Sequence, residues 1–86
     1  MVKNVIMPKV SDVMENGTVA SWLKKEGDKV EKGEPLLEIE VEKAIMEIES
    51  EYDGYLRKIL VKEGETVPVG TILAYITDTL DENIPE

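Results

Sequence analysis

Two stretches of this chain are near copies of each other. Residues 17–40 read GTVASWLKKEGDKVEKGEPLLEIE, and residues 54–77 read GYLRKILVKEGETVPVGTILAYIT. They align without a gap at an offset of 37, and nine of the 24 aligned positions are identical. A duplication of this kind predicts one compact domain made of two similar halves, related by approximate twofold symmetry.

The composition of the repeats favours strands. Valine and isoleucine together number 18 against seven leucines, and β-branched side chains suit a pleated sheet. Each repeat has turns around its glycines, which leaves room only for strands of about five residues. In the second copy, Val67-Pro68-Val69-Gly70 is expected to form a type I turn with Pro second and Gly fourth. This spacing predicts an all-β fold, a small barrel or sandwich.

Residues 36–50 have two interpretations. Their apolar residues fit one face of a helix, but they also alternate as two strands. The repeat favours a hairpin, because LLEIE aligns with LAYIT in the second copy. Keeping apolar residues on one face pairs Val41 with Met46 and Ile39 with Ile48. Residues 42–45 then form a four-residue type I turn, with Lys43 second and pointing into solvent.

Composition excludes several classes of function. At 86 residues the chain is long enough for one small domain. Cysteine and histidine are both absent, which removes thiolate metal sites, thiol nucleophiles and the commonest general base. A net charge of −9 opposes binding to nucleic acid and favours partners with basic surfaces. We expect no metal site.

Targeting signals are not evident in the sequence. No apolar run approaches the roughly 18 residues that a membrane span needs, and the N-terminus lacks a signal-peptide pattern. We therefore expect no membrane contact and a cytoplasmic location, or the mitochondrial matrix in a eukaryote. The acidic residues 79–86 are expected to be a tail or the start of a linker, after a domain of residues 1–78.

Lys43 lies at the midpoint between the two repeats, so the symmetry makes its position unique among the nine lysines. An exposed amine is almost wholly protonated at neutral pH and is a poor catalyst by itself. It is a good attachment point when another enzyme supplies a base and an activated acid. The alternative is an ordinary surface lysine on an acidic β-barrel interaction module.

The residues around Lys43 carry a family resemblance. The segment EIEVEKA at 38–44 resembles the lipoylation motif of lipoyl domains from the acyltransferase component of 2-oxo acid dehydrogenase complexes. In that family Thr is usual where Val41 stands, and Asp where Glu42 stands. Biotinyl domains share the fold, but their lysine usually lies between two methionines rather than between Glu42 and Ala44. The resemblance covers residues 1–77 and includes MPKVS at 7–11, MENGT at 14–18, WLKKEGDKV at 22–30, GE at 33–34, DG at 53–54 and VKEGETV at 61–67.

This resemblance implies a fold and a function. The fold would be a flattened barrel of two four-stranded antiparallel sheets with quasi-twofold symmetry. Lys43, within the motif of Val41, Glu42 and Ala44, would hold lipoate in amide linkage as a swinging arm, on a monomeric domain with no catalytic activity. The implied partners are a lipoate ligase or lipoyl transferase, a 2-oxo acid decarboxylase, the acyltransferase core and dihydrolipoyl dehydrogenase.

Two further features concern partner recognition. The predicted register places Glu38 opposite Glu49 and Glu40 opposite Glu47, on the outward face beside Lys43. This acidic face is either a solvated surface or, at Glu40 and Glu47, a surface that steers basic partners. The loop at residues 9–16 is either a simple connector or, by the family resemblance, a recognition element for the decarboxylase through Ser11, Asp12 and Val13.

Overall fold

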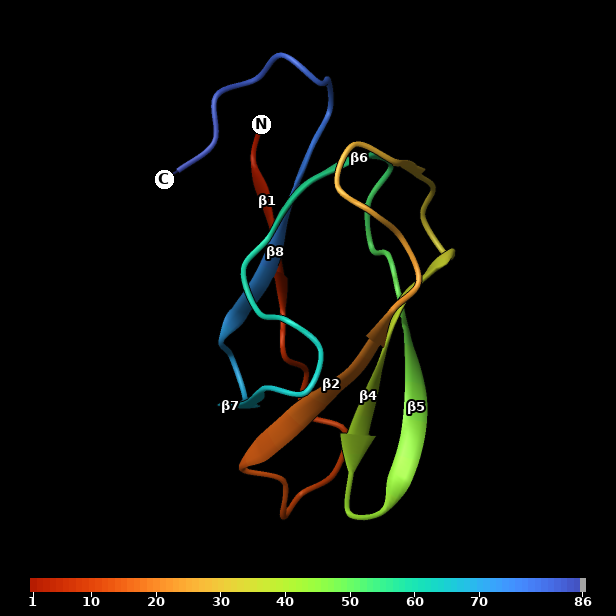
Figure 1. The fold of residues 1–86 in the computed structure, drawn as a ribbon, viewed down its shortest axis with the longest axis vertical. Helices are drawn as coiled ribbons and strands as arrows, with labels where there is room; N and C mark the ends of the chain where they lie inside the picture. Colours follow the sequence, from red (N-terminus) through yellow and green to blue (C-terminus); the bar gives the residue numbers. More distant parts are fainter. Residues whose placement is uncertain (86) are drawn as a thin grey trace.

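The computed structural model describes residues 1–85, and within them the chain forms eight short strands and no helix (Figure 1). This confirms the all-β prediction and the hairpin interpretation of residues 36–50. The strands are β1 (Lys3–Ile6), β2 (Asn16–Trp22), β3 (Lys29–Val30), β4 (Pro35–Val41), β5 (Ala44–Glu49), β6 (Gly54–Ile59), β7 (Thr66–Pro68) and β8 (Ile72–Thr77).

The strands form two four-stranded sheets in which every neighbouring pair is antiparallel. One sheet has the order β1-β8-β6-β3, and the other has the order β5-β4-β2-β7. The short middle strand of each repeat pairs with a strand of the other repeat: β3 pairs with β6, and β7 pairs with β2. The predicted architecture of two four-stranded antiparallel sheets is confirmed.

The twofold relation extends to individual backbone hydrogen bonds. The Gly27 N–H donates to the Leu56 carbonyl at 2.7 Å, and its counterpart Gly64 donates to the Val19 carbonyl at 2.8 Å. Each donor and each acceptor is displaced by the repeat offset of 37 from its equivalent. These paired bonds join the first repeat to the second, so each half stabilises the other.

Four tight turns follow one pattern, and it corrects the predicted turn in the second repeat. The turn there spans Pro68–Thr71 rather than 67–70, because the Thr71 N–H donates to the Pro68 carbonyl at 3.1 Å. Gly70 is therefore third and has φ 91°, which identifies a type II turn rather than type I. A positive φ at this position is the reason for glycine. The other three turns, also with glycine third, span 25–28, 31–34 and 62–65.

The core lies between the two sheets and explains the alternation along β4. Leu37, Ile39 and Val41 are buried, whereas Glu40 between them is exposed. The inward side chains of the opposite sheet cover them. The buried apolar residues are Val5, Met7, Met14, Val19, Val30, Leu36, Leu37, Ile39, Val41, Leu56, Val61, Leu73, Ala74 and Ile76.

The segment after β8 turns back onto the barrel. The Arg57 guanidinium donates to the Thr77 hydroxyl at 3.2 Å and to the Glu82 carbonyl at 2.7 Å. The N-terminal amine of Met1 contacts the carboxylates of Asp78 and Glu82. Glu82 belongs to the part of the expected tail that the structure describes, while residue 86 lies outside the described residues.

Candidate functional site

The β4–β5 hairpin ends in a two-residue turn that consists of Glu42 and Lys43. Val41 pairs with Ala44, so no further residue takes part in the reversal. The φ angles are 51° at Glu42 and 70° at Lys43, and two successive positive values are typical of a type I′ turn. The four-residue type I turn predicted for residues 42–45 is therefore wrong. The positive φ at two non-glycine residues is the feature that sequence reasoning missed.

The register of the hairpin differs from the predicted one by two residues. Ile39 pairs with Met46, not with Ile48, and Val41 pairs with Ala44, not with Met46. Side chains alternate with a period of two, so this slip leaves each residue on the face that was predicted for it. Only the opposing partners change.

The acidic pairs are corrected by the same slip. Glu38 lies opposite Glu47, and Glu40 lies opposite Ile45. Ile45 stands on the outward face and is 55% exposed, so an apolar side chain borders the acidic surface beside the tip. The sequence pattern placed Ile45 in the turn, and only the correct register would have identified it as a surface residue.

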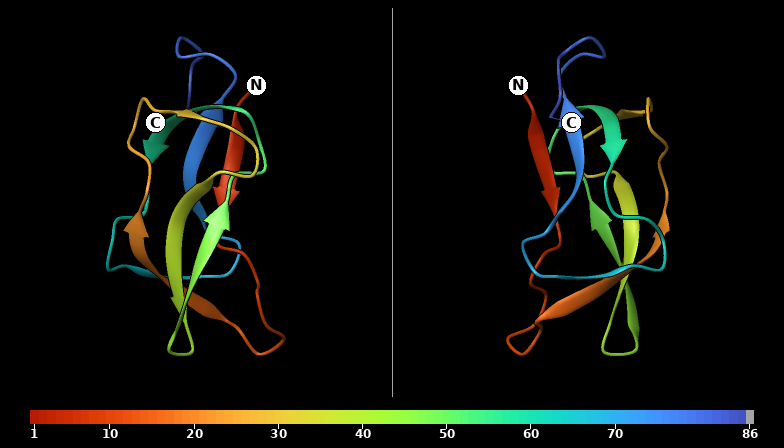
Figure 2. Two further views of the ribbon diagram at one scale, coloured as in Figure 1. Left: turned by 90° about the vertical axis from the view of Figure 1, so that its right-hand side faces the viewer. Right: turned by 60° about the vertical axis from the view of Figure 1, so that its left-hand side comes forward.

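Lys43 stands at one end of the molecule. The hairpin tip lies at one end of the 38 Å long axis, and both termini lie toward the other end (Figures 1 and 2). Lys43 is exposed, and within residues 1–85 its amine forms no ion pair and no side-chain hydrogen bond. The amine is thus available to a modifying enzyme.

The loop before β2 lies beside the tip. In both views of Figure 2 it occupies the same end of the molecule as the hairpin, and the Ser11 hydroxyl donates to the Glu42 carboxylate at 3.4 Å. The buried side chain of Met14 anchors the loop to the core. Asp12 and Val13 at its crest are exposed, Val13 by 74%. The structure therefore brings Ser11 to the residue next to Lys43 and leaves its two neighbours accessible.

Charge is segregated between the two sheets. The strands of the sheet that carries Lys43 at its hairpin contain four glutamates and neither lysine nor arginine: Glu38, Glu40, Glu47 and Glu49. The strands of the other sheet contain four cations and no carboxylate: Lys3, Lys29, Arg57 and Lys58. The acidic strands thus lie on the side of the molecule that presents Lys43. The sequence shows this segregation only once each strand is assigned to its sheet.

Among residues 1–85, no group of three or more carboxylates is arranged to hold a metal ion. The same residues contain no helix that is long and apolar enough to cross a bilayer.

Comparison with known proteins identifies the family. Residues 3–76 match the family model Biotin_lipoyl, described as "Biotin-requiring enzyme". The solved lipoyl domain of the 2-oxoglutarate dehydrogenase complex from Azotobacter vinelandii superimposes with a TM-score of 0.73 at 36% identity. That match covers 88% of this chain and 96% of the solved one.

Curated relatives agree with this match. The dihydrolipoyllysine-residue acetyltransferase component of the acetoin cleaving system of Bacillus subtilis is 49% identical over the whole chain. Component 5 of the chloroplastic pyruvate dehydrogenase complex of Arabidopsis thaliana is 44% identical over 94% of it. The chain spans 21% and 17% of the lengths of these relatives. It belongs to the biotinyl/lipoyl family, as a lipoyl domain of the kind found in acyltransferase components of 2-oxo acid dehydrogenase complexes.

Proposed function

We propose that Lys43 carries lipoate in amide linkage and that the domain is a swinging-arm carrier without catalytic activity of its own. The observation that supports this most directly is the position of Lys43. Its exposed amine stands at the apex of the hairpin, on a fold that matches a lipoyl domain. The residues present fit the group, because an amide bond needs only an accessible amine and room for a ligase around it.

The arm needs little chemistry from the protein. Lipoate, when bound, supplies a disulfide ring that can be reduced, acylated and reoxidised. The chain has no cysteine or histidine to compete with that ring or to replace it. The task of the domain is to hold Lys43 away from the core, so that one tethered group reaches several active sites at a high effective concentration.

The proposed partners follow from the family. They are a lipoate ligase or lipoyl transferase, a 2-oxo acid decarboxylase, an acyltransferase core and dihydrolipoyl dehydrogenase, all acting on a monomeric domain. The named relatives include chloroplastic, mitochondrial and bacterial proteins. We place this domain in the compartment of its complex, the bacterial cytoplasm or the mitochondrial matrix.

Intact mass tests the attachment. The chain is co-expressed with a lipoate ligase in medium containing lipoate, together with the variants Lys43→Met and Lys62→Met. Lys62 is the matched control, because it is another exposed lysine that belongs to a tight turn. We expect the increment of one lipoyl group in the parent and in Lys62→Met, and none in Lys43→Met. A biotin-sized increment, or an unmodified parent, would contradict the proposal.

We propose that the acidic face and the loop guide recognition. Glu40 and Glu47 are exposed near the tip, so they are placed to attract basic rims of the ligase and the decarboxylase. Glu40→Lys/Glu47→Lys should lower the initial rates of lipoylation and reductive acylation at low salt. Glu31→Lys/Glu51→Lys changes the charge equally on exposed residues outside this face and outside the loop, and should lower the rates less. Equal rates for both pairs would refute the role of the acidic face.

The loop is tested separately. Asp12→Ala/Val13→Ser alters two exposed side chains, so the fold should be retained. Ser11→Ala removes the hydrogen bond to Glu42. If the loop helps the decarboxylase recognise its carrier, both variants should be lipoylated normally and acylated more slowly. Unchanged acylation by the cognate decarboxylase would leave the loop as a connector.

A further inference from the structure

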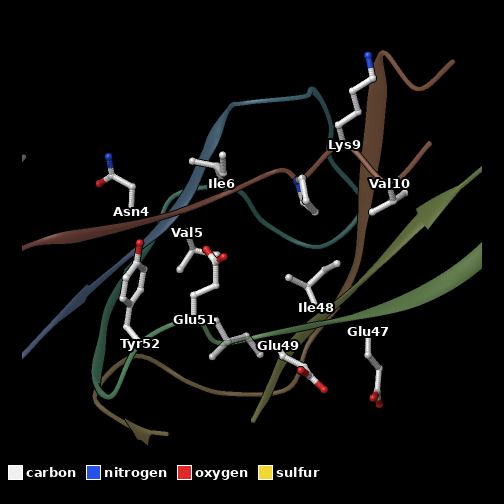
Figure 3. Close-up of a pocket in the computed structure, with 12 residues that line it drawn as sticks. Asn4, Val5, Ile6, Lys9, Val10, Glu47, Ile48, Glu49, Glu51 and Tyr52 are labelled. Carbon is white, nitrogen blue, oxygen red and sulfur yellow. The ribbon is translucent and has the colours of Figure 1, made fainter. Parts of the chain in front are cut away.

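One side of the sandwich is open. The edge strands β1 and β5 belong to different sheets, and within residues 1–85 no backbone ladder joins them. Between them lies a cavity of about 510 Å³, which is within the usual range of ligand pockets (Figure 3). We call it the seam groove; it is lined by Asn4, Val5, Ile6, Pro8, Lys9, Val10, Leu36, Glu47, Ile48, Glu49, Glu51 and Tyr52.

The two walls of the seam groove occupy equivalent positions in the two halves. Val5 pairs with Ala74 and Ile48 pairs with Leu37, and Ala74 and Leu37 are related by the repeat offset. The pseudo-twofold axis therefore relates one wall to the other. The charge of the two walls does not follow this symmetry, because the β5 wall has glutamates where the β1 wall has neutral residues. Glu47, Glu49 and Glu51 correspond to Asn4, Ile6 and Pro8.

The floor between the walls is apolar. Val5 and Leu36 form its buried part, and Val10 and Ile48 are half-buried. Ile6 is 46% exposed although it lies on a strand. An occupant with apolar side chains would therefore remove hydrophobic surface from water. Lys9 lies on the β1 side of the groove and is the only cation that lines it among the described residues.

β5 is the longest edge strand of the described sheets. Natural edges are blunted by short length, lysine or proline. β1 carries Lys3, β3 has two residues, and β7 has three residues including Pro68. β5 has six residues, and its sequence AIMEIE contains neither lysine nor proline.

The free backbone groups of β5 can be assigned from the hairpin. Val41 and Ala44 close a two-residue turn, so they form a hydrogen-bonded pair, and such pairs alternate along the strand. Ala44, Met46 and Ile48 thus bond to β4. The N–H and C=O groups of Ile45 and Glu47 point away from β4, and those of Glu49 follow the same alternation. These are the groups that an added strand would use.

We propose that the seam groove is a docking site for an extended segment of a partner protein with alternating apolar and basic residues, which adds to the sheet along β5. Main-chain hydrogen bonds to the free edge would supply affinity, and the apolar floor would take alternate side chains. Glu47, Glu49 and Glu51 complement the basic side chains. The proposed docking uses neither Lys43 nor its modification, although Glu47 also belongs to the acidic face.

The proposal is tested with the chain carrying Lys43→Arg, so that no modification can contribute. The probe is a blocked hexapeptide of alternating valine and lysine, added during amide NMR and hydrogen-exchange measurements. We expect saturable shifts on β1 and β5, and slower exchange at the amides of Ile45, Glu47 and Glu49. Alternating valine–glutamate and proline–lysine peptides are the controls, because the first reverses the charge and the second removes donor N–H groups.

A charge variant supplies a second readout. Glu49→Gln/Glu51→Gln should weaken binding of the valine–lysine peptide about five-fold, from two surface charge pairs. The matched pair Glu15→Gln/Glu31→Gln removes the same charge outside the groove and should leave affinity within about two-fold. The proposal would be overturned if the control peptides bind as tightly as the valine–lysine peptide, or if the valine–lysine peptide does not bind. If exchange at the same amides is already slow without peptide, and becomes slower as protein concentration rises, the β5 edge pairs with a second copy of the chain instead.

Discussion

Glu42 and Lys43 are consecutive residues in the left-handed region, with φ angles of 51° and 70°. Asparagine and glycine are the usual residues of such a turn, because other side chains meet the following carbonyl there. The hairpin accepts this conformation because the strands on both sides hold it, from Val41 opposite Ala44 onwards. Local backbone cost thus falls on the two residues that form the apex.

Replacing Glu42 should relieve part of this cost. We expect Glu42→Asn to raise the free energy of unfolding by about 0.5–1 kcal/mol, since asparagine tolerates the left-handed region. Urea denaturation measures this. Glu40→Asn is the control, because the same replacement within a strand removes strand propensity and should lower stability. A Glu42→Asn variant that is less stable than the parent would contradict the turn geometry.

Gly54 should be the glycine least tolerant of substitution. Its φ is 151°, and a Cβ there would lie 2.2 Å from the carbonyl oxygen of Thr77, which cannot move without breaking the sheet. We expect Gly54→Ala to cost about 3 kcal/mol or more. At Gly27 no heavy atom beyond the adjacent residues lies within 4 Å of the added Cβ, so Gly27→Ala should cost only about 1 kcal/mol for its positive φ. Comparable losses in urea denaturation would contradict the close contact.

Two symmetry-related glutamates should contribute equally to stability. The Trp22 N–H donates to the Glu63 carboxylate at 2.8 Å, and the Ile59 N–H donates to the Glu26 carboxylate at 2.7 Å. Each of Glu63→Ala and Glu26→Ala should lower the free energy of unfolding by about 1 kcal/mol, as for a hydrogen bond to a charged group at the surface.

The control for this pair is Glu31→Ala, because the Glu31 side chain is exposed and forms no hydrogen bond within the described residues. It should change stability by less than about 0.5 kcal/mol. If the Glu26 and Glu63 variants differ widely from each other, the two halves are not energetically equivalent.

The contacts of the C-terminal segment should depend on pH in both directions. The hydrogen bond from Glu82 raises the pKa of the N-terminal amine above its usual 8.0, so this contribution is complete below about pH 8 and is lost as pH rises through the raised pKa. Lys3 and the N-terminal amine lower the pKa of Asp78 below 3.8. That contribution is present above about pH 4 and is lost as pH falls through the lowered pKa.

Amide NMR of residues 78–82 across this range measures detachment of the segment. Its signals should move at both extremes, and less so at high salt because the charges are exposed. Acetylation of the N-terminus should abolish the alkaline transition and leave the acidic one. Signals that do not move at either extreme would show that these ion pairs do not hold the segment.

The repeat in the sequence predicted more of this structure than any single motif. Its offset of 37 identified which strands are equivalent, and it decided between helix and hairpin at residues 36–50. It did not reveal the register of the hairpin. Pairing Ile39 with Met46 or with Ile48 buries the same face, so the apolar pattern cannot separate the two.

The predictions of the two turns were wrong for a different reason. Glu42 and Lys43 have no sequence signature of positive φ, and the turn around Gly70 was assigned one residue early because proline was given the second position. The seam groove depends on which strands become edges, and that is a property of the closed fold. The position of Lys43 at the hairpin tip was therefore predictable from the sequence, but the turn type, the strand register and the groove were not.

The exchange of β3 and β7 between the halves has a practical consequence for transplanting this domain. Either half taken alone would leave its short strand, β3 or β7, without a neighbour and the apolar side of its longer strands exposed to water. Splitting the chain near residue 50 should yield two fragments that are insoluble apart and regain structure only on mixing. Whoever grafts the Lys43 hairpin onto another scaffold must move the entire 1–77 unit with it.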